Sequence, residues 1–151
     1  MANASDAFVV KVDRVVSEIT DQMKSRGVRA ANELTTAKNH VLRGQRSGRR
    51  YRVPNTRRYY KASAPGEVPA QRTGQYRLKW DEKSYAGSAG DKLIVKSQIE
   101  SRVRTDNGKY NLGTLLEKGS PGGKIAPRPH KKKIADKARP KIVKIYKEPY
   151  L

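Results

Sequence analysis

The feature that most constrains the fold of this chain is a stripe of apolar residues at helical spacing. From Phe8 to Val41 these residues recur at steps of three or four, which is the pattern of one buried helix face. Gly27 fills the one missing place, and the pattern stops at Arg43-Gly44, where we expect Gly44 to take the left-handed position after the helix. The stripe consists of Phe8, Val12, Val15, Ile19, Met23, Ala30, Leu34, Ala37 and Val41.

We expect residues 1–43 to form the long helix, and its striped part from Phe8 to Arg43 would be about 55 Å long at the standard rise per residue. That is longer than a single domain of 151 residues needs. Two interpretations stay open: the helix packs on the sheet of its own chain, or part of it lies along a neighbouring subunit. Glycine costs roughly 1 kcal/mol relative to alanine inside a helix, so we expect a bend or a close packing contact at Gly27.

The composition favours a binding or assembly protein with an anionic partner. Apolar residues make up 35% of the chain, and the net charge is +20. Such a charge favours nucleic acid, an anionic membrane or an acidic protein surface. The absence of cysteine excludes disulfides and thiolate metal sites. We find no apolar run long enough to span a bilayer and no signal-peptide pattern, so we expect an intracellular protein without a membrane partner.

Residues 44–63 predict a basic β-hairpin or arm. Tyrosine and valine alternate with the charges here, and Val53-Pro54-Asn55-Thr56 has the composition of a turn between two strands. Three interpretations stay open: a solvated hairpin whose charges prevent edge pairing, a surface that docks on an acidic protein, or a contact with DNA. The candidate contact residues are Arg46, Arg49, Arg50, Arg52, Arg57, Arg58 and Lys61.

Residues 64–74 predict a rigid elbow between this hairpin and the core. Proline fixes its own φ angle and moves the preceding residue out of the helical region, while glycine permits turns. We expect Glu67 to pair with a nearby arginine and Thr73 to cap a short helix that contains Tyr76 and Trp80. The elbow residues that carry the prediction are Pro65, Gly66, Pro69, Thr73 and Gly74.

Residues 75–126 predict short helices and a sheet. Residues 92–100 are rich in β-branched side chains and form the clearest strand, which residues 101–105 could extend. Asp106-Asn107-Gly108 predicts a turn, residues 110–118 a short helix ended by Gly119, and residues 120–124 a loop.

Residues 127–151 predict a C-terminal helix and tail. The expected buried side is Ile134, Ala138, Ile142 and Ile145 or Tyr146, and Pro140 should kink the helix or start a second one. Its many lysines form either a solvated face or a contact to an acidic partner or DNA. The predicted fold class is α+β, with a long N-terminal helix and a C-terminal helix packed on a small antiparallel sheet that carries the basic hairpin.

The sequence shows no pattern of catalytic or metal-binding residues. His40 and His130 lack a second ligand at helical or finger-like spacing. Gly122-Gly123-Lys124 lacks the spacing of a phosphate-binding loop, and the acidic residues are scattered. We therefore expect no enzymatic activity, no cofactor and no metal.

Three segments resemble a family of tailed-phage head–tail joining proteins, also called tail-completion or neck proteins. The first, Ala62–Ala70, reads Ala-Ser-Ala-Pro-Gly-Glu-Val-Pro-Ala and is followed by Arg72-Thr73-Gly74-Gln75-Tyr76-Arg77. The second runs from Tyr110 to Ser120, and the third is Ala126-Pro127-Arg128-Pro129-His130. They come in the order found in the family, with similar spacing. Lys118 replaces an aromatic residue and His130 replaces a phenylalanine of the family pattern.

The resemblance implies a structural virion protein. Family members form rings, commonly sixfold, between the portal or adaptor and the tail tube, and the genome passes through the ring. The expected partners are therefore other copies of the chain in a hexamer or dodecamer, portal, adaptor and tail-tube or tail-terminator proteins, and double-stranded DNA. Such a protein would be made in the cytoplasm of the bacterial host and located in the neck of the virion. The alternative is a stand-alone basic nucleic-acid-binding protein.

Overall fold

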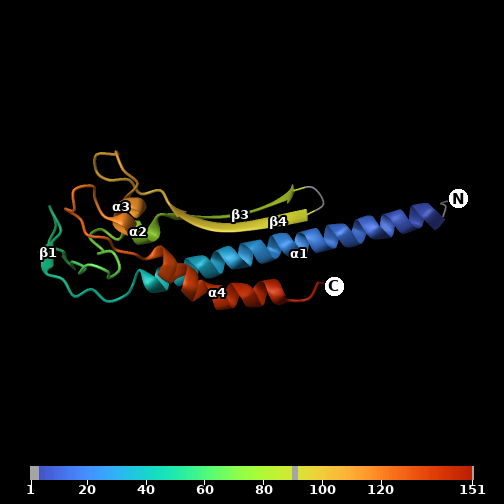
Figure 1. Ribbon diagram of the computed structural model, residues 1–151, viewed down its shortest axis with the longest axis horizontal. Helices are drawn as coiled ribbons and strands as arrows, with labels where there is room; N and C mark the ends of the chain where they lie inside the picture. The colour runs from blue at the N-terminus through green and yellow to red at the C-terminus, as the bar shows by residue number, and fades with distance from the viewer. Residues whose placement is uncertain (1–3, 90–91, 151) are drawn as a thin grey trace.

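The computed structural model describes residues 4–89 and 92–150 and has the predicted α+β fold class (Figure 1). Its strands form two separate antiparallel ribbons rather than one small sheet that carries a hairpin. The longer ribbon is β3–β4, in which Trp80 pairs with Ser101 and Ala89 with Lys92. The elements are α1 (Ala4–Val41), β1 (Arg50–Arg52), β2 (Tyr59–Lys61), α2 (Gln75–Leu78), β3 (Trp80–Ala89), β4 (Lys92–Ser101), α3 (Leu112–Lys118) and α4 (Lys131–Lys147).

Helix α1 is the centre of the molecule, with the β3–β4 ribbon along one side and α4 along the other (Figure 1). The core lies where the three meet, around the buried residues Ala37, Ile134 and Ala138. Trp80 and Ile99 pack against this core from the ribbon. Burial alternates along β4, because every second side chain faces α1. Trp80 thus belongs to the core, as expected, although it begins β3 instead of lying in the preceding helix.

Gly27 marks the closest approach of α1 to the ribbon. A Cβ atom at this position would lie 2.4 Å from Ser84 Oγ and 2.5 Å from Val95 Cγ1. The Ser97 hydroxyl donates a hydrogen bond of 2.6 Å to the Gly27 carbonyl. The prediction of a close packing contact is confirmed, and α1 continues through it as one helix.

The end of α1 differs from the prediction. Gly44 does not have a positive φ angle; its N–H donates to the Val41 carbonyl at 3.0 Å. A Cβ atom on Gly44 would lie 3.0 Å from the Val41 carbonyl oxygen and 3.3 Å from Val68 Cγ2, so glycine relieves crowding there rather than permitting a left-handed turn. The start of α2 also differs, because Gly74 with φ 78° takes the capping position expected for Thr73.

Most of the predictions for the second half are confirmed, with two corrections. The turn after Thr105, helix α3 and its end at Gly119 lie where expected. Strand β4 ends at Ser101, beyond which Arg104 forms an isolated bridge with Asn111 instead of extending the strand. Helix α4 runs through Pro140 without a second start. Its buried side contains Ile145, whereas Tyr146 is exposed.

Candidate functional site

Strands β1 and β2 form the predicted basic hairpin. They pair antiparallel in the register Arg50–Lys61 to Arg52–Tyr59. The Val53 N–H donates to the Arg58 carbonyl at 2.8 Å, and the turn places Asn55 at a φ angle of 59°. Asparagine tolerates this left-handed conformation better than most residues. The hairpin is short, with three residues in each strand.

Six of the seven candidate residues form an exposed cationic surface on this hairpin. Within residues 4–89 and 92–150, none of the six forms an ion pair with a carboxylate. Two of them brace the hairpin internally: Arg52 Nε donates to the Thr56 carbonyl at 2.7 Å, and the Arg50 guanidinium lies 4.8 Å from the centre of the Tyr59 ring. The hairpin therefore presents uncompensated positive charge; its members are Arg49, Arg50, Arg52, Arg57, Arg58 and Lys61.

Arg46 does not belong to this surface, which corrects its assignment as a contact residue. Its guanidinium is half-buried and donates to three carbonyl oxygens: Leu42 at 2.5 Å, Gly44 at 3.0 Å and Pro69 at 3.0 Å. Burial lowers the pKa of Arg46. The Leu42 and Gly44 carbonyls follow the C-terminal end of α1, where a cation is favourable, and the Pro69 carbonyl belongs to the elbow. Arg46 thus joins α1 to the elbow instead of facing a partner.

Glu67 organises the elbow through backbone and hydroxyl donors rather than through an arginine, so the predicted arginine pairing is wrong. Its carboxylate accepts hydrogen bonds from Ser47 Oγ at 2.6 Å, Ser47 N at 3.0 Å and Ala64 N at 2.7 Å. These bonds lower the pKa of Glu67 to about 2. Gly66, with φ 79°, accepts a hydrogen bond from Lys133 Nζ at 3.0 Å. The elbow is therefore held both at the entry to the hairpin and at the first turn of α4.

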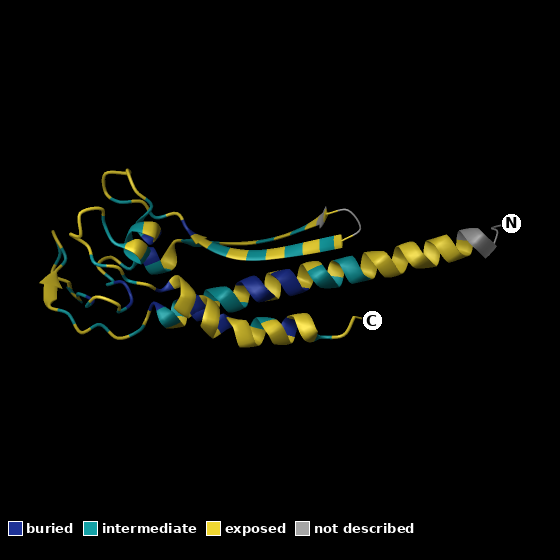
Figure 2. Cartoon of the chain, in the orientation of Figure 1, coloured by how far each residue is buried: buried dark blue, intermediate teal, exposed yellow. Residues whose placement is uncertain are grey.

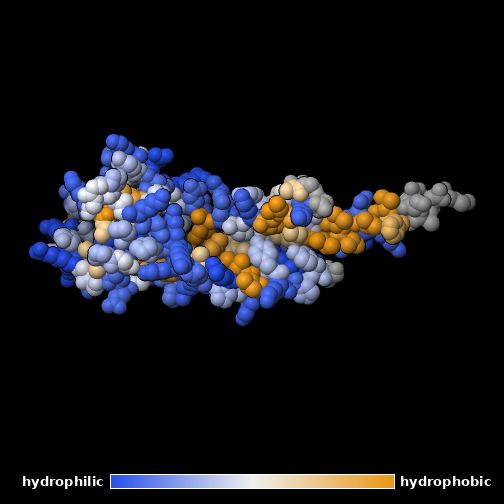
Figure 3. Space-filling view, viewed as in Figure 1, coloured by the Kyte–Doolittle hydropathy of each residue, from blue (hydrophilic) through white to orange (hydrophobic). Residues whose placement is uncertain are grey.

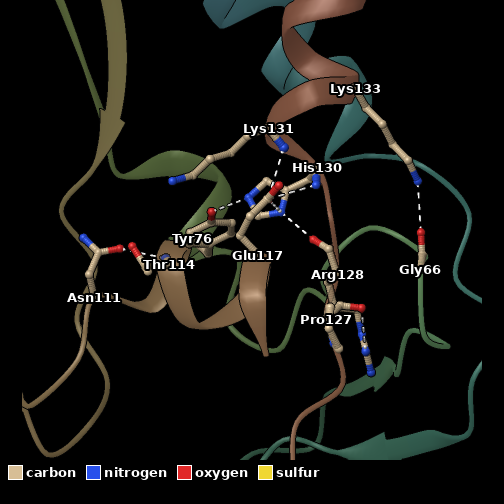
Figure 4. Close-up of polar contacts among 10 residues, drawn as sticks. All are labelled: Gly66, Tyr76, Asn111, Thr114, Glu117, Pro127, Arg128, His130, Lys131 and Lys133. Atoms are coloured by element: carbon tan, nitrogen blue, oxygen red, sulfur yellow. Dashed lines mark hydrogen bonds and ion pairs between the residues drawn. The ribbon is translucent and has the colours of Figure 1, made fainter. Parts of the chain in front are cut away.

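A buried polar cluster around His130 fixes the other side of the elbow (Figure 4). The ring of His130 is fully buried; Nε2 lies 2.6 Å from the Tyr76 hydroxyl, and Nδ1 lies 2.7 Å from the Arg128 carbonyl. This geometry suits a neutral ring that donates from Nδ1 and accepts from Tyr76 at Nε2. Burial lowers the pKa of His130, although the Arg128 carbonyl and Glu117 oppose the shift.

Glu117 links the cluster to the backbone of α4. One of its carboxylate oxygens accepts from the backbone N–H of His130 at 3.0 Å and of Lys131 at 3.2 Å, which satisfies free donors at the helix start. Arg128 extends the network to the elbow by donating to the hydroxyl and the carbonyl of Ser63, at 2.7 and 2.9 Å. This cluster was not predicted from the sequence. No local pattern could have found it, because Tyr76, Glu117 and His130 come from three separate segments.

A groove of about 650 Å³ lies beside the elbow, between α2 and α3. Its apolar lining includes Leu112, Leu115 and Leu116 of α3. Four arginines also line the groove, whereas Asp106 is the one acidic residue among its described lining residues. We call this feature the elbow groove; its arginines are Arg72, Arg77, Arg104 and Arg128.

The N-terminal part of α1 projects beyond both the ribbon and α4, and we call residues 7–18 the arm (Figure 2). Every residue of the arm is exposed. Phe8 is 68% exposed, Val12 43% and Val15 50%, although they continue the stripe that buries Ala30 and Ala37 farther along. A space-filling view shows apolar surface along this projection (Figure 3). Whether a neighbouring subunit covers the arm stays a prediction.

Other classes of site find little support in the described residues. Between residues 4 and 150, leaving out 90–91, no three histidine or acidic side chains gather as a metal site would require. The helices of that same part of the chain include none with the length and hydropathy of a membrane span. The lysines of α4 are mostly exposed, although Lys141 pairs with Glu33 at 2.9 Å.

Comparison with family models, curated proteins and solved structures finds no match to this chain.

Proposed function

We propose that this chain is a structural subunit of a ring in the neck of a tailed phage, where it joins the head to the tail and lets the genome pass. The exposed apolar arm of α1 is the observation that carries the proposal. A protein that works alone seldom presents such a row of large apolar side chains, because burial of each one is worth roughly 1.5–3 kcal/mol. In a ring, a neighbouring copy of the chain can bury that row of side chains.

The position of the basic hairpin supports a docking role within such a ring. The hairpin lies at the end of the molecule away from the arm (Figure 1). Its charges lack acidic partners among the described residues, and arginine pairs well with carboxylate. We assign it to an acidic surface of an adaptor or tail protein rather than to DNA. Each neutralised phosphate would add affinity and so slow a genome that must slide through.

Charge reversal on the hairpin tests the docking role. The variant Arg49→Glu, Arg50→Glu, Arg57→Glu, Arg58→Glu should still form rings in native mass spectrometry, because these side chains lie outside the core. It should fail to support the joining of purified heads and tails. The matched control reverses four exposed lysines of α4, which changes the net charge equally on another surface: Lys132, Lys137, Lys144 and Lys147. If the hairpin variant joins heads to tails as well as the control does, the docking role is wrong.

A second candidate, a stand-alone nucleic-acid-binding protein, draws on the same hairpin. Tyr51 and Tyr60 stack with their ring centres 6.0 Å apart beside the arginines, an arrangement that could also receive bases. This candidate predicts that the monomer binds DNA or RNA tightly and loses affinity steeply as salt rises. A stable ring with weak, salt-insensitive binding would instead favour the neck protein.

A further inference from the structure

We infer that the arm of one copy binds the elbow groove of a second copy, so that subunits join head to tail. This inference rests on the proposed ring and names the two surfaces that form its subunit contact. Three observations carry it: the charge of the N-terminal segment that contains the arm, the lining of the groove, and the placement of the two features on the molecule.

The arm lies in an acidic segment of a strongly basic chain, although the arm itself is neutral, because Lys11 and Arg14 balance Asp13 and Glu18. Residues 1–21 contain four acidic and two basic side chains, whereas the whole chain has a net charge of +20. Glu18 pairs with Arg14 at 3.0 Å, and Asp21 pairs with Lys24 at 3.5 Å. The partner surface that matches this segment combines apolar and basic side chains. Most of this chain is positively charged, so its basic surfaces would attract the acidic segment 1–21 of another copy.

The elbow groove has both properties. Leucines of α3 supply apolar surface, and four arginines line the groove with a single acid among its described residues. Arg72 is exposed, and Leu115 and Leu116 are half-buried, so all three are open to a ligand. A volume of about 650 Å³ admits several side chains, such as those of Phe8 and Val12.

The arm and the groove lie at opposite ends of the molecule, at the N-terminus and beside α2 and α3 respectively (Figure 1). One chain therefore cannot place its own arm in its own groove. A contact between two different patches on identical chains is head to tail, and it closes into a ring when the rotation between copies allows. A contact between two arms would instead give a two-fold dimer and would bring together two copies of the acidic segment 1–21.

Site-specific cross-linking tests the contact, because the chain contains no cysteine of its own. Val12→Cys is made in one preparation of the full chain and Arg72→Cys in another, and the mixture is treated with a short bismaleimide. The expected product is a cross-linked pair with one chain of each kind. The control replaces Val12→Cys by Val10→Cys, which points about 200° away around the helix. This control should cross-link at least about tenfold less, since its side of the helix faces away from the groove.

Several outcomes would overturn the inference: cross-linking of Val12→Cys chains to one another, equal cross-linking from Val10→Cys, or no cross-link. Native mass spectrometry of the unmodified chain separates the two proposals. A ring without the Val12–Arg72 cross-link refutes the arm–groove contact and leaves the proposed function standing. A chain that stays monomeric refutes the arm–groove contact, and tight, salt-dependent binding of DNA or RNA by that monomer would refute the proposed function as well.

A second variant avoids dependence on one cross-link. Val12→Gln with Val15→Gln removes apolar surface from the stripe without touching the core, because both side chains are exposed. The concentration at which half of the chains assemble should rise by about tenfold or more, while Val10→Gln should leave it nearly unchanged. Equal effects of the two variants would count against the stripe as the contact surface.

Discussion

Tyr76→Phe removes a single oxygen atom from the buried cluster around His130, and its cost can be worked out from the structure. The Tyr76 hydroxyl lies 2.6 Å from Nε2 of a fully buried ring. Without the hydroxyl, Nε2 is left unpaired away from water, and such a group costs about 1–3 kcal/mol. In a chain of this length each kcal/mol lowers the melting temperature by about 2–4 °C.

The assay is urea denaturation at pH 8, at one protein concentration, with Tyr110→Phe as the matched control. The Tyr110 side chain is exposed, so its variant should stay within about 0.5 kcal/mol of the parent chain. The double variant Tyr76→Phe, His130→Phe replaces both partners by apolar rings. It should cost less than the sum of the two single variants, because neither partner is then left unpaired. Additive costs would refute the assigned hydrogen bond.

The same cluster predicts how stability depends on pH. The unfolded chain protonates His130 near its ordinary pKa of 6.5, whereas burial lowers the pKa in the folded chain. The unfolded state therefore binds more protons as the pH falls below 6.5, and the free energy of unfolding decreases. The contribution is fully present above pH 6.5 and is lost as the pH falls toward the folded pKa. His130→Phe should flatten this part of the profile, and an unchanged profile would show that His130 does not titrate as described.

Three further predictions concern the packing and the elbow. Gly27→Ala gains about 1 kcal/mol of helix propensity but must displace Ser84 or Val95, and such overpacking costs about 1–3 kcal/mol. Urea denaturation should therefore show a net loss of unfolding free energy of up to about 2 kcal/mol. The control Gly87→Ala should change little, because nothing lies within 4 Å of its Cβ position. Asn111→Ala removes the oxygen that accepts from Thr114 N at 3.1 Å at the start of α3, and thermal unfolding should report a loss of about 1 kcal/mol. Glu67→Gln should flatten the dependence of the unfolding free energy on pH between pH 4.5 and about 2. The lowered pKa of Glu67 gives stability that is present above its ordinary pKa and is lost as the pH falls toward the folded value. Acid titration followed by circular dichroism would measure this profile, and a profile identical to that of the parent would exclude the Glu67 carboxylate as its source.

Local patterns predicted the elements of this fold well. The three- and four-residue spacing of α1, the β-branched run of β4 and the turn at Asn107-Gly108 depend on neighbouring residues, and all three lie where expected. The errors occur where distant segments decide the outcome. Gly44 is close-packed against Val68, a contact between residues far apart in the sequence.

The candidate site was harder to predict for the same reason. Arg46 lies in a segment with the composition of a basic contact hairpin, yet its guanidinium donates to carbonyls at the end of α1 and in the elbow. His130 gave no chemical signal alone, because its partners Tyr76 and Glu117 come from two other segments. Charge patterns show how many arginines a segment holds, but only the tertiary structure shows which of them already have a partner.

The continuity of α1 sets a phase relationship between its two halves. The arm and the core-facing segment belong to one uninterrupted helix of 38 residues, so the direction in which Phe8 points depends on every residue between it and Gly27. Inserting one residue near position 21 would turn the arm by about 100°, whereas inserting seven would restore its direction to within about 20° and extend it by roughly 10 Å. Changes in the length of α1 should therefore be tolerated in steps of about seven residues, each moving the arm outward without turning its apolar face away.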